Sequence, residues 1–100
     1  MGKTYTFHTD PGHGWLQVNR SELVRLGIAD QVSNFSYERG GVVYLEEDCD
    51  ASLFIKAKRD AGEPVELSDL HTNSDHWIRN LQSYEDNVVT RETIMGILGS

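Results

Sequence analysis

The sequence predicts a single α+β domain spanning residues 1–100, in which a small antiparallel sheet of two hairpins carries two to four helices, mainly on one face. Three observations lead to this prediction. Short segments with alternating or continuous apolar residues are separated by glycine-rich turns, which is typical of strands in hairpins. Amphipathic segments with start and stop signals indicate helices. Strands and helices do not alternate strictly along the chain, which favours antiparallel pairing over a parallel sheet.

Residues 3–18 predict the first hairpin. Tyr5 and Phe7 alternate with polar residues, which is the two-residue period of a half-buried strand. The sequence Asp-Pro-Gly-His-Gly at residues 10–14 is a strong turn signal. Residues 15–18 then resume the alternation, so we expect them to pair with the first strand.

A short helix is predicted next, over residues 20–26. Asn19 and Glu22 have the spacing of a capping box, in which each side chain satisfies a free backbone N–H group. Leu23 lies on the side of the helix that we expect to be buried. Gly27 follows at the position where helices commonly end in a left-handed residue.

Residues 35–45 predict a second hairpin, whose second strand is the centre of the fold. Phe35 and Tyr37 alternate with polar residues, and Arg-Gly-Gly at residues 39–41 forms the turn. The continuous apolar run at residues 42–45 fits a strand that is covered on both faces.

A helix that ends at Gly62 is predicted after this strand. Asp48 or Asp50 is placed to cap its N-terminus, where carboxylates are favoured. Phe54 belongs to the apolar face of the helix, and Lys58 is assigned with its charged neighbours to the solvent face.

The last third of the chain predicts shorter elements. Residues 64–67 form an edge strand or an extended connection, because Pro64 cannot donate a hydrogen bond to a neighbouring strand. Ser74 or Asp75 caps a helix that carries Trp77 and the apolar residues after it.

Residues 88–98, from Val88 to Leu98, are rich in large apolar side chains near the end of the chain. We expect them to form a helix that packs on the body of the protein. If the helix does not pack there, it offers an interface through which the protein forms homo-oligomers.

The charge is uneven along the chain. Residues 1–40 hold four cations and four carboxylates, whereas residues 41–100 hold five cations and twelve carboxylates, so the net charge of −7 lies in the second part. This distribution argues against nucleic acid as a direct ligand, because phosphate binding needs clustered Lys and Arg. It permits binding to a basic, nucleic-acid-binding protein, although an acidic surface that only keeps the protein soluble is the alternative. The candidate partner-binding residues are Glu46, Glu47, Asp48, Asp50, Glu63, Glu66 and Asp69, with His13 and Trp15 of the first hairpin.

The composition also bears on location. No run of about 18 apolar residues occurs, so no membrane span is expected. The N-terminus lacks the hydrophobic core of a signal peptide. Cys49 is the only cysteine and has no partner for an internal disulfide, so we expect the protein to reside in a reducing cytoplasm.

His8, Asp10 and His13 are the candidate metal ligands, since two imidazoles and a carboxylate near one hairpin tip suit zinc. No recognised ligand spacing such as HExxH or paired CxxC accompanies them. In the alternative interpretation, Asp10 caps the turn and both histidines face solvent. We therefore expect no cofactor, and a small metal-binding domain or enzyme is the alternative function.

No catalytic residue can be assigned from the sequence. Carboxylates surround Cys49 and raise the pKa of its thiol, which disfavours a nucleophilic role. Glu47, Asp48 and Asp50 are a candidate calcium or magnesium site, but they lack the further oxygen ligands and the glycine of a calcium loop, and helix capping explains the same residues. Dinucleotide-binding and phosphate-binding glycine motifs are absent from the sequence. We expect a protein that is not an enzyme.

The stretches TYTFHTDPGHGWLQV, SELVRLGI and VYLEEDCDASLFI resemble a set of small proteins encoded by bacteriophages and mobile elements, and DPGHGWL is the most specific part. The resemblance implies phage accessory cargo, a class that includes inhibitors of host defence such as anti-CRISPR proteins. It implies no catalytic residue. The expected function is to bind and inhibit a basic, nucleic-acid-binding protein in the cytoplasm of a bacterial host. An oligomeric structural component of a phage is a further alternative.

Overall fold

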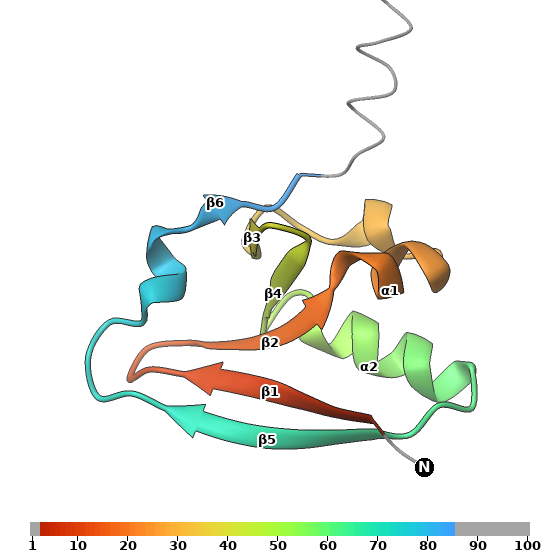
Figure 1. Cartoon of the computed structure of the whole chain (residues 1–100), viewed down its shortest axis with the longest axis horizontal. Helices are drawn as coiled ribbons and strands as arrows, with labels where there is room; N and C mark the ends of the chain where they lie inside the picture. The colour runs from red at the N-terminus through yellow and green to blue at the C-terminus, as the bar shows by residue number, and fades with distance from the viewer. Residues whose placement is uncertain (1–2, 86–100) are drawn as a thin grey trace, which may run out of the picture.

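Six strands form one open sheet in the computed structural model, which describes residues 3–85 (Figure 1). The strand order is β5-β1-β2-β4-β3-β6, and every neighbouring pair is antiparallel except β1 and β5, which are parallel. The α+β class is therefore confirmed, and the sheet extends beyond the two predicted hairpins. The strands are β1 Lys3–Thr9, β2 Gly14–Asn19, β3 Tyr37–Arg39, β4 Val42–Glu46, β5 Val65–His71 and β6 Gln82–Ser83.

Both predicted hairpins are present as the pairs β1–β2 and β3–β4. The turn of the second hairpin places Gly40 and Gly41 at φ angles of +55° and +83°, which side chains with a Cβ rarely adopt. Phe35 differs from the prediction because it lies in the turn before β3, where its side chain is 65% exposed. The turn is closed by backbone and hydroxyl hydrogen bonds to Ser33, which prevent the strand from starting earlier.

Two α-helices occur among residues 3–85, α1 Arg20–Arg25 and α2 Ala51–Asp60, which is the lower end of the predicted number. The other helical segments are single 3₁₀ turns, η1 Ala29–Gln31 and η2 Trp77–Asn80. The predicted helix around Trp77 is thus only η2. The N-cap of η2 is His76 and not Ser74 or Asp75. The His76 imidazole accepts a hydrogen bond from the Ile78 N–H group.

Both α-helices pack on the same face of the sheet (Figure 1). Leu23 of α1 and Phe54 of α2 are fully buried against the central strands. Leu16 of β2 and Leu45 of β4 lie in the same cluster, because alternate residues of a strand point to one side. This main core is what fixes β2 and β4 in the middle of the sheet.

The opposite face of the sheet carries a second, smaller core. Trp15 and Tyr44 project from β2 and β4 and are covered by Ile78 of η2, which is completely buried. Val43 and Leu45 meanwhile face the helices, so the prediction that this strand is covered on both faces is confirmed.

The structure changes the roles of three predicted helix residues. Asn19 and Asp50 stand at the N-cap positions of α1 and α2, but neither side chain makes a capping hydrogen bond. Lys58 is 3% exposed instead of facing solvent. It lies four residues after Phe54 and therefore on the same face of α2, where Glu22 and Glu63 accept hydrogen bonds from its ammonium group.

Of the two alternatives for residues 64–67, the structure has the edge strand: β5 begins at Val65, continues to His71 and pairs with β1 over its whole length. The predicted helix from Val88 to Leu98 lies outside the described residues. Among residues 3–85, none of the helices has the length and apolar character that crossing a membrane requires.

Candidate functional site

The turn between β1 and β2 is built around the buried carboxylate of Asp10. Its Oδ1 accepts hydrogen bonds from the backbone N–H groups of Gly12 and His13, each at 2.9 Å. Its Oδ2 accepts from the N–H group of His76, at 3.0 Å. Arg79 of η2 donates to both oxygens, at 2.6 and 2.9 Å. The turn is thereby tied to a segment more than sixty residues away.

Arg79 is the main reason that the pKa of Asp10 lies well below its usual range. Burial opposes this shift, and the backbone N–H groups of His76, His13 and Gly12 add to it. The same pair raises the pKa of Arg79. Because all its acceptor positions face protein donors, Asp10 serves as a structural anchor, and a metal ion would have to displace Arg79 to reach it.

The anchored turn holds His13 beside the end of β4. The His13 carbonyl accepts a hydrogen bond from the Asp10 N–H group, and its own N–H group binds Asp10, so both backbone groups of His13 are fixed. Gly14 comes next, and a Cβ there would lie 2.7 Å from the ring of Phe7, so a larger residue would force that ring to move. The Gly14 carbonyl accepts from the Glu47 N–H group and thereby extends the pairing of β2 with β4.

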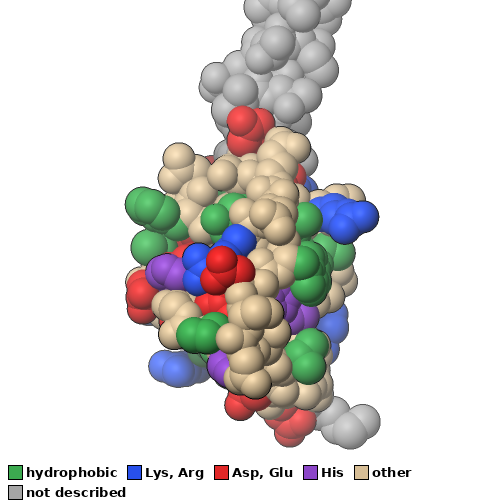
Figure 2. All heavy atoms as spheres, turned by 90° about the vertical axis from the view of Figure 1, so that its left-hand side faces the viewer, with side chains coloured by type: hydrophobic (Ala, Val, Ile, Leu, Met, Phe, Trp, Pro, Cys, Tyr) green, Lys and Arg blue, Asp and Glu red, His purple; other side chains and the backbone are tan. Residues whose placement is uncertain are grey.

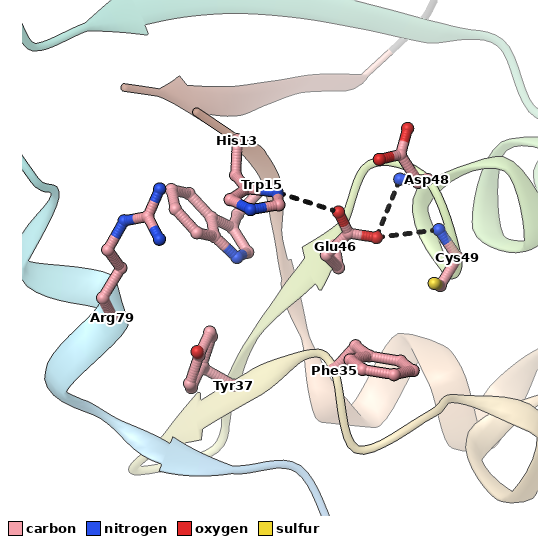
Figure 3. A pocket seen from close by; sticks show the side chains of 8 residues that line it. All are labelled: His13, Trp15, Phe35, Tyr37, Glu46, Asp48, Cys49 and Arg79. Atoms are coloured by element: carbon pink, nitrogen blue, oxygen red, sulfur yellow. Dashed lines mark hydrogen bonds and ion pairs between the residues drawn. The ribbon is translucent and has the colours of Figure 1, made fainter. Parts of the chain in front are cut away.

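Glu46 is the centre of the pocket that opens at this place (Figure 3). Its Oε2 accepts hydrogen bonds from the backbone N–H groups of Asp48 and Cys49, at 2.8 and 2.9 Å. Its Oε1 lies 3.5 Å from Nδ1 of His13. Figure 3 shows Phe35 on the other side of Glu46 from His13. The pocket has a volume of about 300 Å³ and is lined by His13, Trp15, Phe35, Tyr37, Glu46, Asp48, Cys49 and Arg79.

The walls of the pocket combine aromatic rings with carboxylates. Trp15 lies between Arg79 and Glu46, and the guanidinium of Arg79 is 5.3 Å from the centre of the Trp15 ring (Figure 3). Tyr37 packs edge-on against Trp15 from β3. Since Arg79 is neutralised by its pair with Asp10, the surplus charge of the pocket is that of the carboxylates at the end of β4.

Cys49 lines the same pocket but is a poor nucleophile. The pKa of its thiol is raised, first by a hydrogen bond to the Glu46 carboxylate, then by burial and by the charges of Glu46, Asp50 and Asp48. This agrees with the sequence-based expectation that the surrounding carboxylates raise the pKa of Cys49.

The acidic residues predicted to bind a partner do not form one surface. Asp50 is buried and accepts hydrogen bonds from Ser33 and Ser36, where it holds the segment before β3. Glu63 is engaged by Arg25 and Lys58. Glu66 and Asp69 are exposed on β5, at the opposite edge of the sheet from β3. The residues of the set that remain at the pocket or next to it are His13, Trp15, Glu46, Glu47 and Asp48.

Figure 2 views the end of the molecule where the β1–β2 turn lies. Acidic, basic and histidine side chains are interspersed there, with apolar side chains between them. At this end of the molecule, carboxylates therefore lie among basic side chains, because the sheet order places strands of both parts of the chain side by side.

The three predicted metal ligands are not brought together. His8 lies on the opposite face of the sheet from α1 and α2, where its ring is 5.0 Å from that of His76 and close to Tyr44 and Trp77. Its Nε2 donates to the side-chain oxygen of Gln17, at 2.7 Å.

Among the described residues, the metal-ligating side chains that do lie together are those of His13, Glu46 and Asp48, whose ligand atoms are within 4.8 Å of one another. Sequence reasoning missed Glu46 as a ligand. The register in which Trp15 pairs with Glu46 between β2 and β4 places residue 13 beside residue 46, and this register is known only from the structure.

No protein-family model matches the chain, and neither the curated proteins nor the solved structures yielded a similar protein. The function has to be argued from the chemistry of this pocket.

Proposed function

We propose that the protein is an interaction module that binds a basic partner protein by receiving a lysine or arginine side chain in the pocket at the end of β4. The observation that carries this proposal is the combination of Glu46 and Asp48 with three aromatic rings in one small pocket. A cation is attracted both by carboxylates and by the faces of aromatic rings.

The size of the pocket favours a single side chain. A volume of about 300 Å³ stands at the lower end of the range for small-molecule sites, so a dinucleotide or another large cofactor has too little room. A long cationic side chain from a protein surface fits this volume, and its stem would contact the apolar rings.

The aromatic walls differ in how accessible they are. Trp15 is 2% exposed and forms a fixed base, whereas Phe35 is 65% exposed at the rim. A large apolar side chain exposed beside a pocket is the kind of residue that anchors protein–protein contacts. Phe35 therefore extends the surface that a partner would cover.

The class of partner follows from charge. Proteins that bind nucleic acid present clustered Lys and Arg, and a compact acidic protein that occupies such a cluster would block the nucleic acid. We therefore extend the proposal to inhibition: the protein would block a basic, nucleic-acid-binding host protein, as inhibitors of host defence do.

The direct test is a titration of the isotopically labelled full chain with a short arginine-rich peptide in buffer that contains EDTA, followed by two-dimensional NMR. The amide signals of Phe35, Tyr37 and Asp48 should shift. The affinity should fall as ionic strength rises from about 0.1 M to about 1 M, because the Debye length shrinks from about 10 Å to about 3 Å.

Substitutions make the test specific. Asp48→Lys should abolish binding, and Phe35→Ala should weaken it by about two- to fivefold, which corresponds to the loss of one exposed cation–π contact of about 0.5–1 kcal/mol. The matched controls are Asp69→Lys on β5 and Val24→Ala on α1, which change an exposed carboxylate and an exposed apolar residue away from the pocket. Equal losses in Asp48→Lys and Asp69→Lys would mean that only net charge matters and would refute the pocket.

The inhibitory part needs a second measurement. The tagged protein should retain a basic, nucleic-acid-binding protein from a nuclease-treated bacterial lysate and release it as salt rises, and the Asp48→Lys variant should not. The retained protein should also lose its nucleic acid when the wild-type chain is added. If it binds nucleic acid equally well with the chain present, the proposed inhibition is wrong.

A further inference from the structure

We infer that His13, Glu46 and Asp48 form a binding site for one divalent transition-metal ion, for which zinc is the appropriate probe. The site shares two carboxylates with the proposed peptide pocket, but it does not depend on the proposed function, because it rests on the donor atoms and their spacing alone.

The first argument is the state of the Glu46 carboxylate. The residue is 7% exposed, and its side chain is 10% exposed. Its Oε2 accepts two backbone hydrogen bonds, the Cys49 thiol also bonds to the carboxylate, and Oε1 faces Nδ1 of His13. A largely buried carboxylate is stabilised by a charged partner, and a cation between Oε1 and His13 would supply one.

The second argument is the distance between Glu46 and His13. Nδ1 of His13 and Oε1 of Glu46 face each other at 3.5 Å, which exceeds the usual length of an N–H···O hydrogen bond. Two ligands of a tetrahedral zinc ion, each about 2.1 Å from the metal, lie about 3.4 Å apart. The distance between the two atoms is therefore closer to the separation of two metal ligands than to the length of a hydrogen bond.

The third argument is how rigidly these two ligands are held. Asp10 fixes the backbone of His13 on both sides, and the N–H groups of Asp48 and Cys49 fix the orientation of the Glu46 carboxylate. Asp48 is exposed and can adjust, so a small movement of its carboxylate brings the third donor into place. Outer hydrogen bonds that orient the ligands are a regular feature of metal sites.

The donor set indicates the class of ion. One imidazole nitrogen and two carboxylate oxygens suit zinc and its neighbours in the first transition row, whereas calcium requires six to eight oxygen ligands. Three protein ligands leave one position of a tetrahedral ion open to water.

The test is calorimetric titration of the metal-free full chain with zinc chloride, without any peptide, in a buffer that does not bind zinc. About one equivalent should bind, and the melting temperature of the protein should rise in excess zinc, because a ligand that binds only the folded state stabilises it. His13→Ala and Asp48→Asn should each weaken binding by about tenfold or more.

The controls are His71→Ala and Asp69→Asn, which remove an exposed imidazole and an exposed carboxylate on β5. Both should bind zinc like the wild-type chain. Absence of binding by the wild-type chain, or equal binding by wild type and His13→Ala, would overturn the inference. Because no peptide is present, either result would leave the proposed interaction with a basic partner to its own test.

Discussion

At the scale of single residues, the site depends on Asp10 more than on any residue that lines the pocket. Its five hydrogen bonds connect the β1–β2 turn to Arg79 and to the backbone of His76. Without these hydrogen bonds, the positions of His13 and of Arg79, which both line the pocket, would not be fixed. The Asp-Pro-Gly-His-Gly sequence indicates a turn, but the partner of its carboxylate is 69 residues away and has no local signature.

Asp10→Asn should therefore destabilise the protein by about 2 kcal/mol. The amide preserves the size of the side chain but loses the charge that Arg79 requires, and hydrogen bonds to charged groups contribute about 1.5–3 kcal/mol. Urea unfolding of the variant measures this loss, with the exposed Asp69→Asn as the control. If both variants unfold at the same urea concentration, Asp10 is not the anchor that the geometry indicates.

At the scale of elements, α2 shows how a charged residue can belong to a helix face that is buried. Ala51, Phe54 and Lys58 are the buried positions of the helix, and their spacing of three and four residues is that of one face. A lysine at such a position is tolerated because Glu22 and Glu63 lie at 3.4 and 2.8 Å from its Nζ. These ion pairs connect α2 to α1 and to the segment that leads into β5.

Lys58→Ala should cost about 2 kcal/mol of stability. Fully buried ion pairs lose about 3–5 kcal/mol when one partner is removed, and the value is lower here because Glu22 and Glu63 retain some contact with water. Lys56→Ala is the matched control, since its pair with Asp60 is exposed and contributes at most about 0.5 kcal/mol. Thermal unfolding measures the stability of both variants. If both lose the same amount of stability, the ion pairs of Lys58 contribute no more than an exposed pair.

At the scale of the whole molecule, ionisable groups with shifted pKa values stabilise the fold over a defined pH range. The pKa of Glu63 is lowered to about 2 by hydrogen bonds from Arg25 and then Lys58, and that of Asp10 is lowered by Arg79. Burial lowers the pKa of His76, with a further contribution from His8. The pKa of Lys58 is raised because its bonds to Glu63 and Tyr5 and the charge of Glu22 outweigh its burial.

The signs predict a stability plateau between about pH 7 and pH 9. Below about 6.5, the ordinary pKa of histidine, unfolding lets His76 take up a proton, so stability falls. It falls again below about 4.5 as Glu63 and then Asp10 are protonated, since their ionised forms favour the fold. Above about pH 9, unfolding lets the Cys49 thiol release its proton, and above about pH 10 it does the same for Tyr5 and Tyr44 and then for Lys58, so stability is lost as pH rises.

The urea midpoint as a function of pH tests this profile. His76→Gln should remove the first decrease, between about pH 6.5 and 5, and leave the one below about pH 4.5. A variant that retains the first decrease would exclude His76 as its source.

Local patterns determined the class of the fold and the location of most elements. The alternation in β1 and β2, the continuous apolar run of β4 and the amphipathic α2 are set by side chains two to four residues apart, which the sequence displays directly. Turn residues such as Gly40 and Gly41 act through their own backbone angles, and they too can be recognised from sequence.

The tertiary structure alone decided which side chains meet. Asp10 contacts Arg79, and His13 lies beside Glu46, because strand register and the position of η2 bring distant segments together. The parallel pairing of β1 with β5 likewise depends on the whole sheet. The apolar pattern of a strand states which face is buried but not which strand lies next to it, so the pocket could not be assembled from sequence.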